Sequence, residues 1–257
     1  MALLASGASA ETIELATTSQ FTVSGSAVYR SVELPVRLLV DPSPFGRPML
    51  VTTGPLGARL LDPRRVTRDG ADPEVVRVDT SGPQEGFLSV HADGAGLVVD
   101  RDGVKMTLKP APPLLGDRTL DEVMKALPEY RRGAARYTPD RASLEKLSRA
   151  QPTELLVVFG SWCPHCEQLV PKLARVLEDV KDAPITVTFH GVPPGGEGDL
   201  LMDELHVTGL PTAIIRRDGK EVARMEGEAW ATPETTLARL VATSVPSPPK
   251  PPRKDVP

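Results

Sequence analysis

This chain of 257 residues contains two cysteines, Cys163 and Cys166, which are separated by only two residues. An apolar run at residues 155–159 leads into the pair, and an amphipathic stretch with helical spacing follows it. This order predicts a strand, a short turn and then a helix, with Cys163 at the helix N-terminus. Trp162 precedes the pair, and Pro164 suits a first helical turn, where no backbone donor is needed.

A thiol at a helix N-terminus lies near unpaired backbone N–H groups and the positive end of the helix dipole, which favour its thiolate. We therefore expect Cys163 to be an exposed, attacking sulfur, and Cys166 to close a disulfide with it. Two other interpretations stay open. The first is a metal site, although zinc needs about four ligands, no second cysteine pair exists, and no histidine has ligand spacing with this pair. The second is an inert structural disulfide, which would constrain the unfolded chain little because its loop is so small.

The sequence after the motif alternates between helical and strand patterns. In chain order the predicted elements are a helix interrupted by Pro171, a strand at residues 185–189, a short helix near residues 199–206, strands at residues 213–216 and 221–225 joined by the hairpin signal Asp218-Gly219, and a last helix that opens at residues 232–234.

Residues 139–244 resemble a thioredoxin-fold domain in the order and spacing of these elements. The landmarks that carry the resemblance are the W-C-x-x-C motif, Pro171, Pro211, Gly219 and Gly227. The resemblance implies an α/β domain with a mixed central sheet flanked by helices. It also implies that Pro211 is cis and lies against the dithiol, and that the backbone of Leu210 pairs with an extended substrate peptide.

Two features separate this sequence from the commonest members of that family. The dipeptide Pro164-His165 resembles that of DsbA, the periplasmic dithiol oxidant, and an imidazolium beside Cys163 would stabilise the reduced form and make the disulfide more oxidising. The segment between Cys166 and Pro211 is nevertheless too short for the helical insertion of DsbA. In addition, Val157 stands where the family often has a buried Asp or Glu that takes a proton from the resolving cysteine.

The rest of the chain divides into four segments. Residues 1–10 end in an A-x-A pattern and fit either the remnant of a secretory signal or a flexible terminus. Residues 11–110 carry short β-rich runs, which predict a mainly-β module of the sandwich or barrel type for binding or positioning a partner. Residues 111–138 read as a linker with one short helix, which the capping box Thr119-Leu120-Asp121-Glu122 opens. Residues 245–257 read as a disordered, proline-rich tail.

We therefore expect a protein thiol–disulfide oxidoreductase, oxidant or reductant, in which Cys163 and Cys166 carry out the exchange. Residues near them have supporting roles: Pro164 and His165 tune the potential, and Trp162, Leu210 and Pro211 position the substrate. No cofactor and no metal are expected. The alternatives from other classes are a non-catalytic adaptor and a metal carrier.

Composition narrows the possible partners. The formal net charge of −4 gives no reason to expect nucleic acid, and no apolar run reaches the roughly 18 residues of a membrane span. We expect protein thiols or disulfides as substrates, an unidentified redox partner, and a possible partner of the N-terminal β module. A cell-envelope (periplasmic) location is favoured, with the cytoplasm as the alternative.

Overall fold

The computed structural model describes residues 12–31, 35–81, 86–94 and 96–243. The expectations for residues 1–10 and 245–257 lie outside these ranges. The chain divides into two compact units, Met1–Pro112 with Ala126–Glu129, and Pro113–Lys125 with Tyr130–Pro257. Within the described ranges, no helix combines the length and the apolar character that crossing a bilayer requires.

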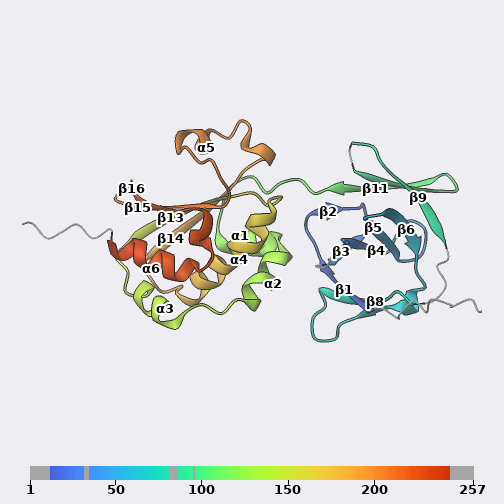
Figure 1. The fold of residues 1–257 in the computed structure, drawn as a ribbon, viewed down its shortest axis with the longest axis horizontal. Coiled ribbons are helices and arrows are strands. Elements are labelled where there is room, and N and C mark those ends of the chain that lie inside the picture. The colour runs from blue at the N-terminus through green and yellow to red at the C-terminus, as the bar shows by residue number, and fades with distance from the viewer. Residues whose placement is uncertain (1–11, 32–34, 82–85, 95, 244–257) are drawn as a thin grey trace, which may run out of the picture. The chain divides into compact units, whose positions relative to one another are not determined.

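The first unit is one curled, all-antiparallel sheet of eleven strands, which confirms the predicted mainly-β fold (Figure 1). The strand order is β2-β11-β10-β9-β6-β5-β4-β3-β1-β8-β7. The strands are β1 Thr12–Thr17, β2 Phe21–Thr22, β3 Ala27–Ser31, β4 Arg37–Asp41, β5 Met49–Thr53, β6 Leu56–Leu60, β7 Val66–Arg68, β8 Val75–Asp79, β9 Phe87–Ala92, β10 Leu97–Arg101 and β11 Val104–Pro110, with the 3-10 helix η1 Pro63–Arg65 before β7.

The central strands of this sheet are buried on both faces. In β4, Leu38 and Val40 belong to one apolar cluster, while Leu39, which points to the opposite face, belongs to another. Met49 and Leu50 of β5 divide between the same two clusters. A continuous apolar run is therefore required here, because each face of the curled sheet covers its own core.

The second unit is built on a mixed five-stranded sheet of order β12-β14-β13-β15-β16, in which only the β13–β14 pair is parallel. Its strands are β12 Gly116–Arg118, β13 Thr153–Phe159, β14 Ile185–Gly191, β15 Thr212–Arg217 and β16 Lys220–Met225. Its helices are α1 Leu120–Ala126, α2 Pro128–Arg136, α3 Arg141–Leu147, α4 Pro164–Asp179, η2 Pro194–Gly196, α5 Leu200–Glu204, η3 Gly227–Trp230 and α6 Pro233–Thr243.

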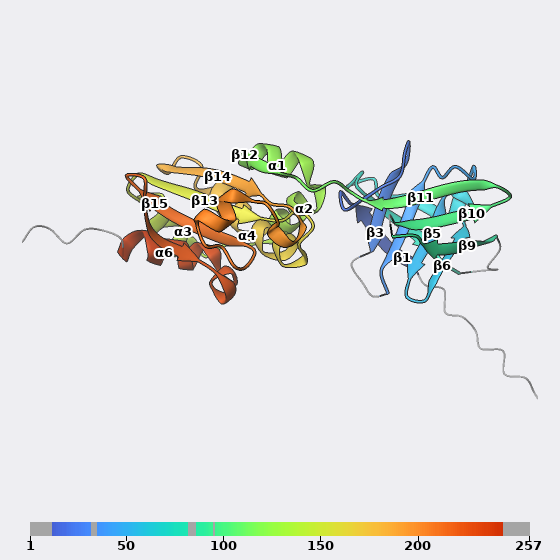
Figure 2. The ribbon, with the colours of Figure 1, turned by 90° about the horizontal axis from the view of Figure 1, so that it is seen from above.

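Helices flank this sheet, as the predicted α/β fold requires. Helices α3 and α6 lie side by side, and α4 contacts α6 (Figures 1 and 2). Helix α2 approaches α4 closely at Gly133, where an added Cβ would lie 2.7 Å from Cβ of Pro171. Pro171 lies inside α4 and is buried. The predicted hairpin turn is present, with positive φ angles of 50° at Asp218 and 73° at Gly219.

The reading of residues 111–138 as a linker needs correction. The short strand β12 pairs with β14 and becomes one edge of the central sheet. Helix α1 opens with the predicted capping box, in which the hydroxyl of Thr119 and the carboxylate of Glu122 bond to each other's backbone N–H. Val123 and Tyr130 are fully buried. This segment is folded because its apolar side chains enter the core of the second unit.

Candidate dithiol site

Cys163 lies at the predicted position, between the end of β13 and the start of α4. It is the N-cap residue of α4, and its Sγ accepts a hydrogen bond from the backbone N–H of Cys166 at 3.4 Å. Pro164 occupies the first helical turn. The sulfur therefore faces the unpaired N–H groups at the helix N-terminus, which stabilise a negative charge there.

The expected exposure of Cys163 was wrong, because only 6% of the residue is accessible. The contact with the N–H of Cys166 folds its side chain over the helix end instead of directing it into solvent. His165 and Pro164 are the exposed residues of the motif. The tuning role of His165 stays a prediction.

Cys166 is completely buried behind Cys163, and both thiols are unbonded. Burial raises the pKa of the Cys166 thiol strongly, and the nearby sulfur of Cys163 adds to this, while a hydrogen bond from the Gly160 N–H opposes it. Position 157, where related domains often have a buried acidic residue, holds a fully buried valine. Because valine has no carboxylate, this position cannot accept the thiol proton. The two sulfurs therefore differ in character, one at a helix end and one in an apolar interior.

Trp162 is half-buried and fixed by two contacts. Its Nε1–H donates to the carbonyl of Val192 at 2.9 Å, and its ring lies directly over Gly160. A Cβ added at Gly160 would lie 2.7 Å from the indole, so only glycine leaves room for the ring. The indole is thus held against the turn that carries the dithiol.

Leu210 and Pro211, the predicted substrate-positioning residues, lie at the end of the segment that contains α5. The Leu210–Pro211 peptide bond is cis, as the resemblance implied. Leu210 and Trp162 both pack against one apolar cluster, which consists of Val158, Val192, Val207 and Ile214. The structure thus brings together two of the residues expected to contact a substrate, on one cluster beside the sheet.

The segment that enters the second unit also touches the turn before the dithiol. The backbone N–H of Leu114 donates to Oγ of Ser161 at 2.9 Å. The carbonyl of Leu114 comes so close to Gly191 that a Cβ there would lie 1.9 Å from its oxygen. No local sequence pattern indicates either contact, because the residues involved are far apart along the chain.

A histidine that the sequence did not single out lies between two carboxylates. Nδ1 of His190 is 2.6 Å from Oδ1 of Asp117, and Nε2 is 3.1 Å from Oδ2 of Asp199. Asp117 is directly opposite His190 in the β12–β14 pair. Both ring nitrogens are engaged by these contacts, and the described residues include no cluster of three or more side chains suited to hold a metal ion.

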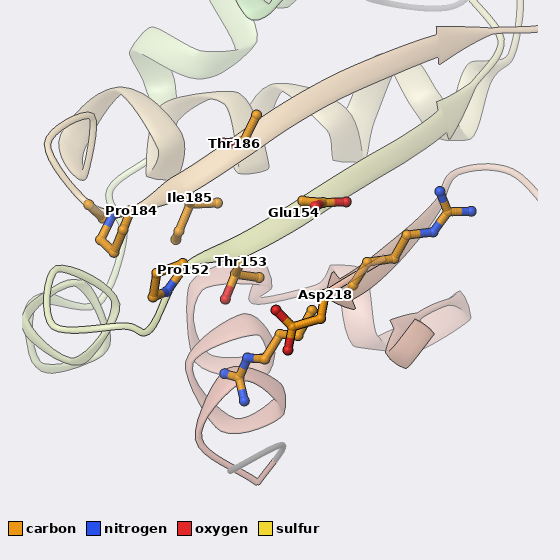
Figure 3. Close-up of a pocket in the computed structure, with 10 residues that line it drawn as sticks. Pro152, Thr153, Glu154, Pro184, Ile185, Thr186 and Asp218 are labelled. Carbon is orange, nitrogen blue, oxygen red and sulfur yellow. The ribbon is translucent and has the colours of Figure 1, made fainter. Parts of the chain in front are cut away.

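A separate pocket of ≈370 Å³ lies at the other end of β13 (Figure 3). Thr153 and Glu154 line it at the start of that strand, together with Ile185 and Asp218. Because the dithiol follows the last residue of β13, this pocket is not part of the dithiol site. Its charged residues have both signs, so it shows no preference for one class of ion.

Known proteins match this chain over part of its length. The family model described as Thioredoxin matches residues 140–242. Thioredoxin-2 of Saccharomyces cerevisiae is 29% identical over 94 residues, which cover 36% of this chain and 86% of the yeast protein. The chloroplastic Thioredoxin Y2 of Arabidopsis thaliana is 29% identical over 101 residues, which cover 38% of this chain and 55% of the plant protein.

Among solved structures, oxidized mitochondrial thioredoxin 3 from Saccharomyces cerevisiae matches with a TM-score of 0.28 and 18% identity, over 43% of this chain and 98% of the yeast chain.

Proposed function

We propose that the thioredoxin domain at residues 140–242 makes this protein a thiol–disulfide oxidoreductase that acts on other proteins. The observation that carries the proposal is the asymmetric dithiol. Cys163 lies at a helix N-terminus with an N–H directed at its sulfur, and Cys166 is buried one turn behind it. A helix N-terminus favours the thiolate that attacks, and a thiol one turn behind it can resolve the mixed disulfide.

In the reducing direction, the Cys163 thiolate attacks a substrate disulfide. The substrate S–S bond breaks, one of its sulfurs leaves as a thiolate, and a mixed disulfide forms with Cys163. Cys166 then gives up its proton and attacks the sulfur of Cys163, which releases the second substrate thiolate. The substrate gains two electrons and the domain ends with a Cys163–Cys166 disulfide; the oxidising direction is the reverse.

The surrounding residues fit supporting roles. Trp162 and Leu210 pack on one apolar cluster. The resemblance to the thioredoxin fold implies that the backbone of Leu210, next to the cis bond to Pro211, pairs with an extended substrate chain. The Pro164-His165 dipeptide favours an oxidising pair, whereas the size of the domain suits a reductant. The reduction potential distinguishes these directions: a value of about −120 mV marks an oxidant, and one of about −270 mV marks a thioredoxin-type reductant.

The test is insulin reduction and dithiol-peptide oxidation with the full-length protein and with two matched variants. We expect Cys163→Ser to abolish both activities. We expect Cys166→Ser to accumulate a mixed disulfide with the substrate, visible on a non-reducing gel, because the attacking thiol is kept and the resolving thiol is lost. Activity in Cys163→Ser equal to that of the wild type would refute the proposal and favour the adaptor alternative.

A further inference from the structure

We propose that His190 is a positioning residue that holds helix α5 to the central sheet through Asp199, and thereby fixes the segment ending at Leu210 and Pro211 for substrate binding. This role rests on the proposed exchange reaction, because it concerns how that reaction binds its protein substrate.

The contact between His190 and Asp199 is well shielded. The side chain of His190 is 14% exposed and that of Asp199 is 11% exposed. An ionised carboxylate only accepts hydrogen bonds, so Nε2 of His190 is the donor in the contact with Asp199. A hydrogen bond to an ionised carboxylate is stronger than one between neutral groups, and a shielded contact is screened less than one at the surface.

Asp199 connects this contact to α5. While Oδ2 accepts from His190, Oδ1 accepts from the backbone N–H of Met202 at 2.9 Å, which makes Asp199 the N-cap of the helix. These two donors lower the pKa of Asp199 against the opposing effect of its burial. Helix α5 has only five residues, so it depends on its caps and its packing for stability.

The far end of α5 is tied to the sheet in a second way. Nη2 of Arg224, on β16, donates to the carbonyl of Leu205 at 3.1 Å. The same guanidinium is held by the carboxylate of Glu221 at 2.7 Å. Contacts from β14 and β16 therefore hold the two ends of α5.

The contacts of His190 with Asp199 and of Arg224 with Leu205 affect the substrate-positioning residues through apolar packing. Met202 and Leu205, at α5, lie in the same cluster as Trp162 and Leu210. Cys163 and Cys166, in contrast, are positioned by β13 and α4. Loosening α5 should therefore weaken substrate binding and leave the chemistry of the sulfurs intact.

Two substitutions at His190 separate its contacts. The amide nitrogen of His190→Gln can occupy the place of Nε2 and keep the bond to Asp199. The amide of His190→Asn reaches only the place of Nδ1, on the side of Asp117. With insulin as the substrate, we expect His190→Asn to raise KM about tenfold, equivalent to about 1.4 kcal/mol, with kcat and the reduction potential unchanged. We expect His190→Gln to stay within about threefold of the wild type.

A second variant and a readout without turnover complete the test. Asp199→Ser keeps an N-cap oxygen for the N–H of Met202 but removes the second carboxylate oxygen, which contacts His190, so it should raise KM as His190→Asn does. In both variants, amide hydrogen exchange across residues 200–205 should accelerate while exchange in α4 does not. Equal KM values for His190→Gln and His190→Asn, or a change confined to kcat or the potential, would overturn the role of His190. A wild-type protein without exchange activity would instead overturn the proposed function, and this role with it.

Discussion

Replacing Gly160 with alanine tests how tightly the indole of Trp162 packs on the turn before the dithiol. A Cβ at this position would lie 2.7 Å from Cε2 and 2.8 Å from Nε1 of Trp162, well inside the usual 3.5–4.0 Å separation of non-bonded heavy atoms. The indole must therefore move by about 1 Å, which breaks its 2.9 Å bond to the carbonyl of Val192. Overpacking costs about 1–3 kcal/mol, and the lost hydrogen bond about 0.5–1.5 kcal/mol. We expect a total loss of about 2–4 kcal/mol.

Urea unfolding followed by tryptophan fluorescence measures this loss. Both tryptophans, Trp162 and Trp230, lie in the second unit, so the signal reports that unit alone. If the free energy of unfolding falls by about 2 kcal/mol per M of urea, the urea concentration at the unfolding midpoint should be lower by about 1–2 M in Gly160→Ala. The matched control is Gly209→Ala, where an added Cβ meets nothing within 4 Å and the change should stay within about 0.5 kcal/mol.

A double-mutant cycle identifies the cause of the loss. In a Trp162→Ala background the added Cβ has no indole to displace, so Gly160→Ala should cost much less there. An unchanged midpoint for Gly160→Ala, or the same cost in both backgrounds, would refute this account of the turn.

Three further changes test other parts of the second unit. Gly133→Ala should lower the free energy of unfolding by about 1–3 kcal/mol in the same urea assay, because the rigid ring of Pro171 lies 2.7 Å from the new Cβ; an unchanged midpoint would contradict the close approach. Tyr137→Phe removes the 2.8 Å bond that its hydroxyl donates to the buried carboxylate of Glu234, and should cost about 1–3 kcal/mol in thermal or urea unfolding. In the reduced protein, burial raises the pKa of the Cys166 thiol, so the folded state keeps this proton at a pH where the unfolded chain loses it. The free energy of unfolding should therefore fall as pH rises above about 8.5. Cys166→Ala should lack this fall between pH 8.5 and 10, and an identical slope in both proteins would argue against a buried thiol.

Local signals in the sequence were sufficient for much of the second unit. The cysteine pair between an apolar run and an amphipathic stretch predicted the strand, turn and helix that place Cys163 at the N-cap of α4. The Asp218-Gly219 turn and the Thr119–Glu122 capping box were also predicted, because each depends on residues that are neighbours in the chain.

Features that depend on residues distant in the chain could not be predicted in this way. Strand β12 has three residues and no apolar pattern, and only its pairing with β14 makes it a strand. The contact of His190 with Asp117 joins residues 73 positions apart and leaves no local trace. The low exposure of Cys163 likewise follows from how its side chain turns over the helix end, which residue type and spacing do not specify.

The edge strand β12 determines where an expressed fragment of the second unit can begin. A fragment that begins at residue 139, where the sequence resemblance begins, would lack β12 and leave one side of β14 without its antiparallel neighbour. Bare strand edges recruit other chains, so such a fragment should self-associate during expression. It would also lose Tyr130, whose ring packs near Phe159 at a centroid distance of 6.2 Å. Cloning of the second unit should therefore start at Pro113.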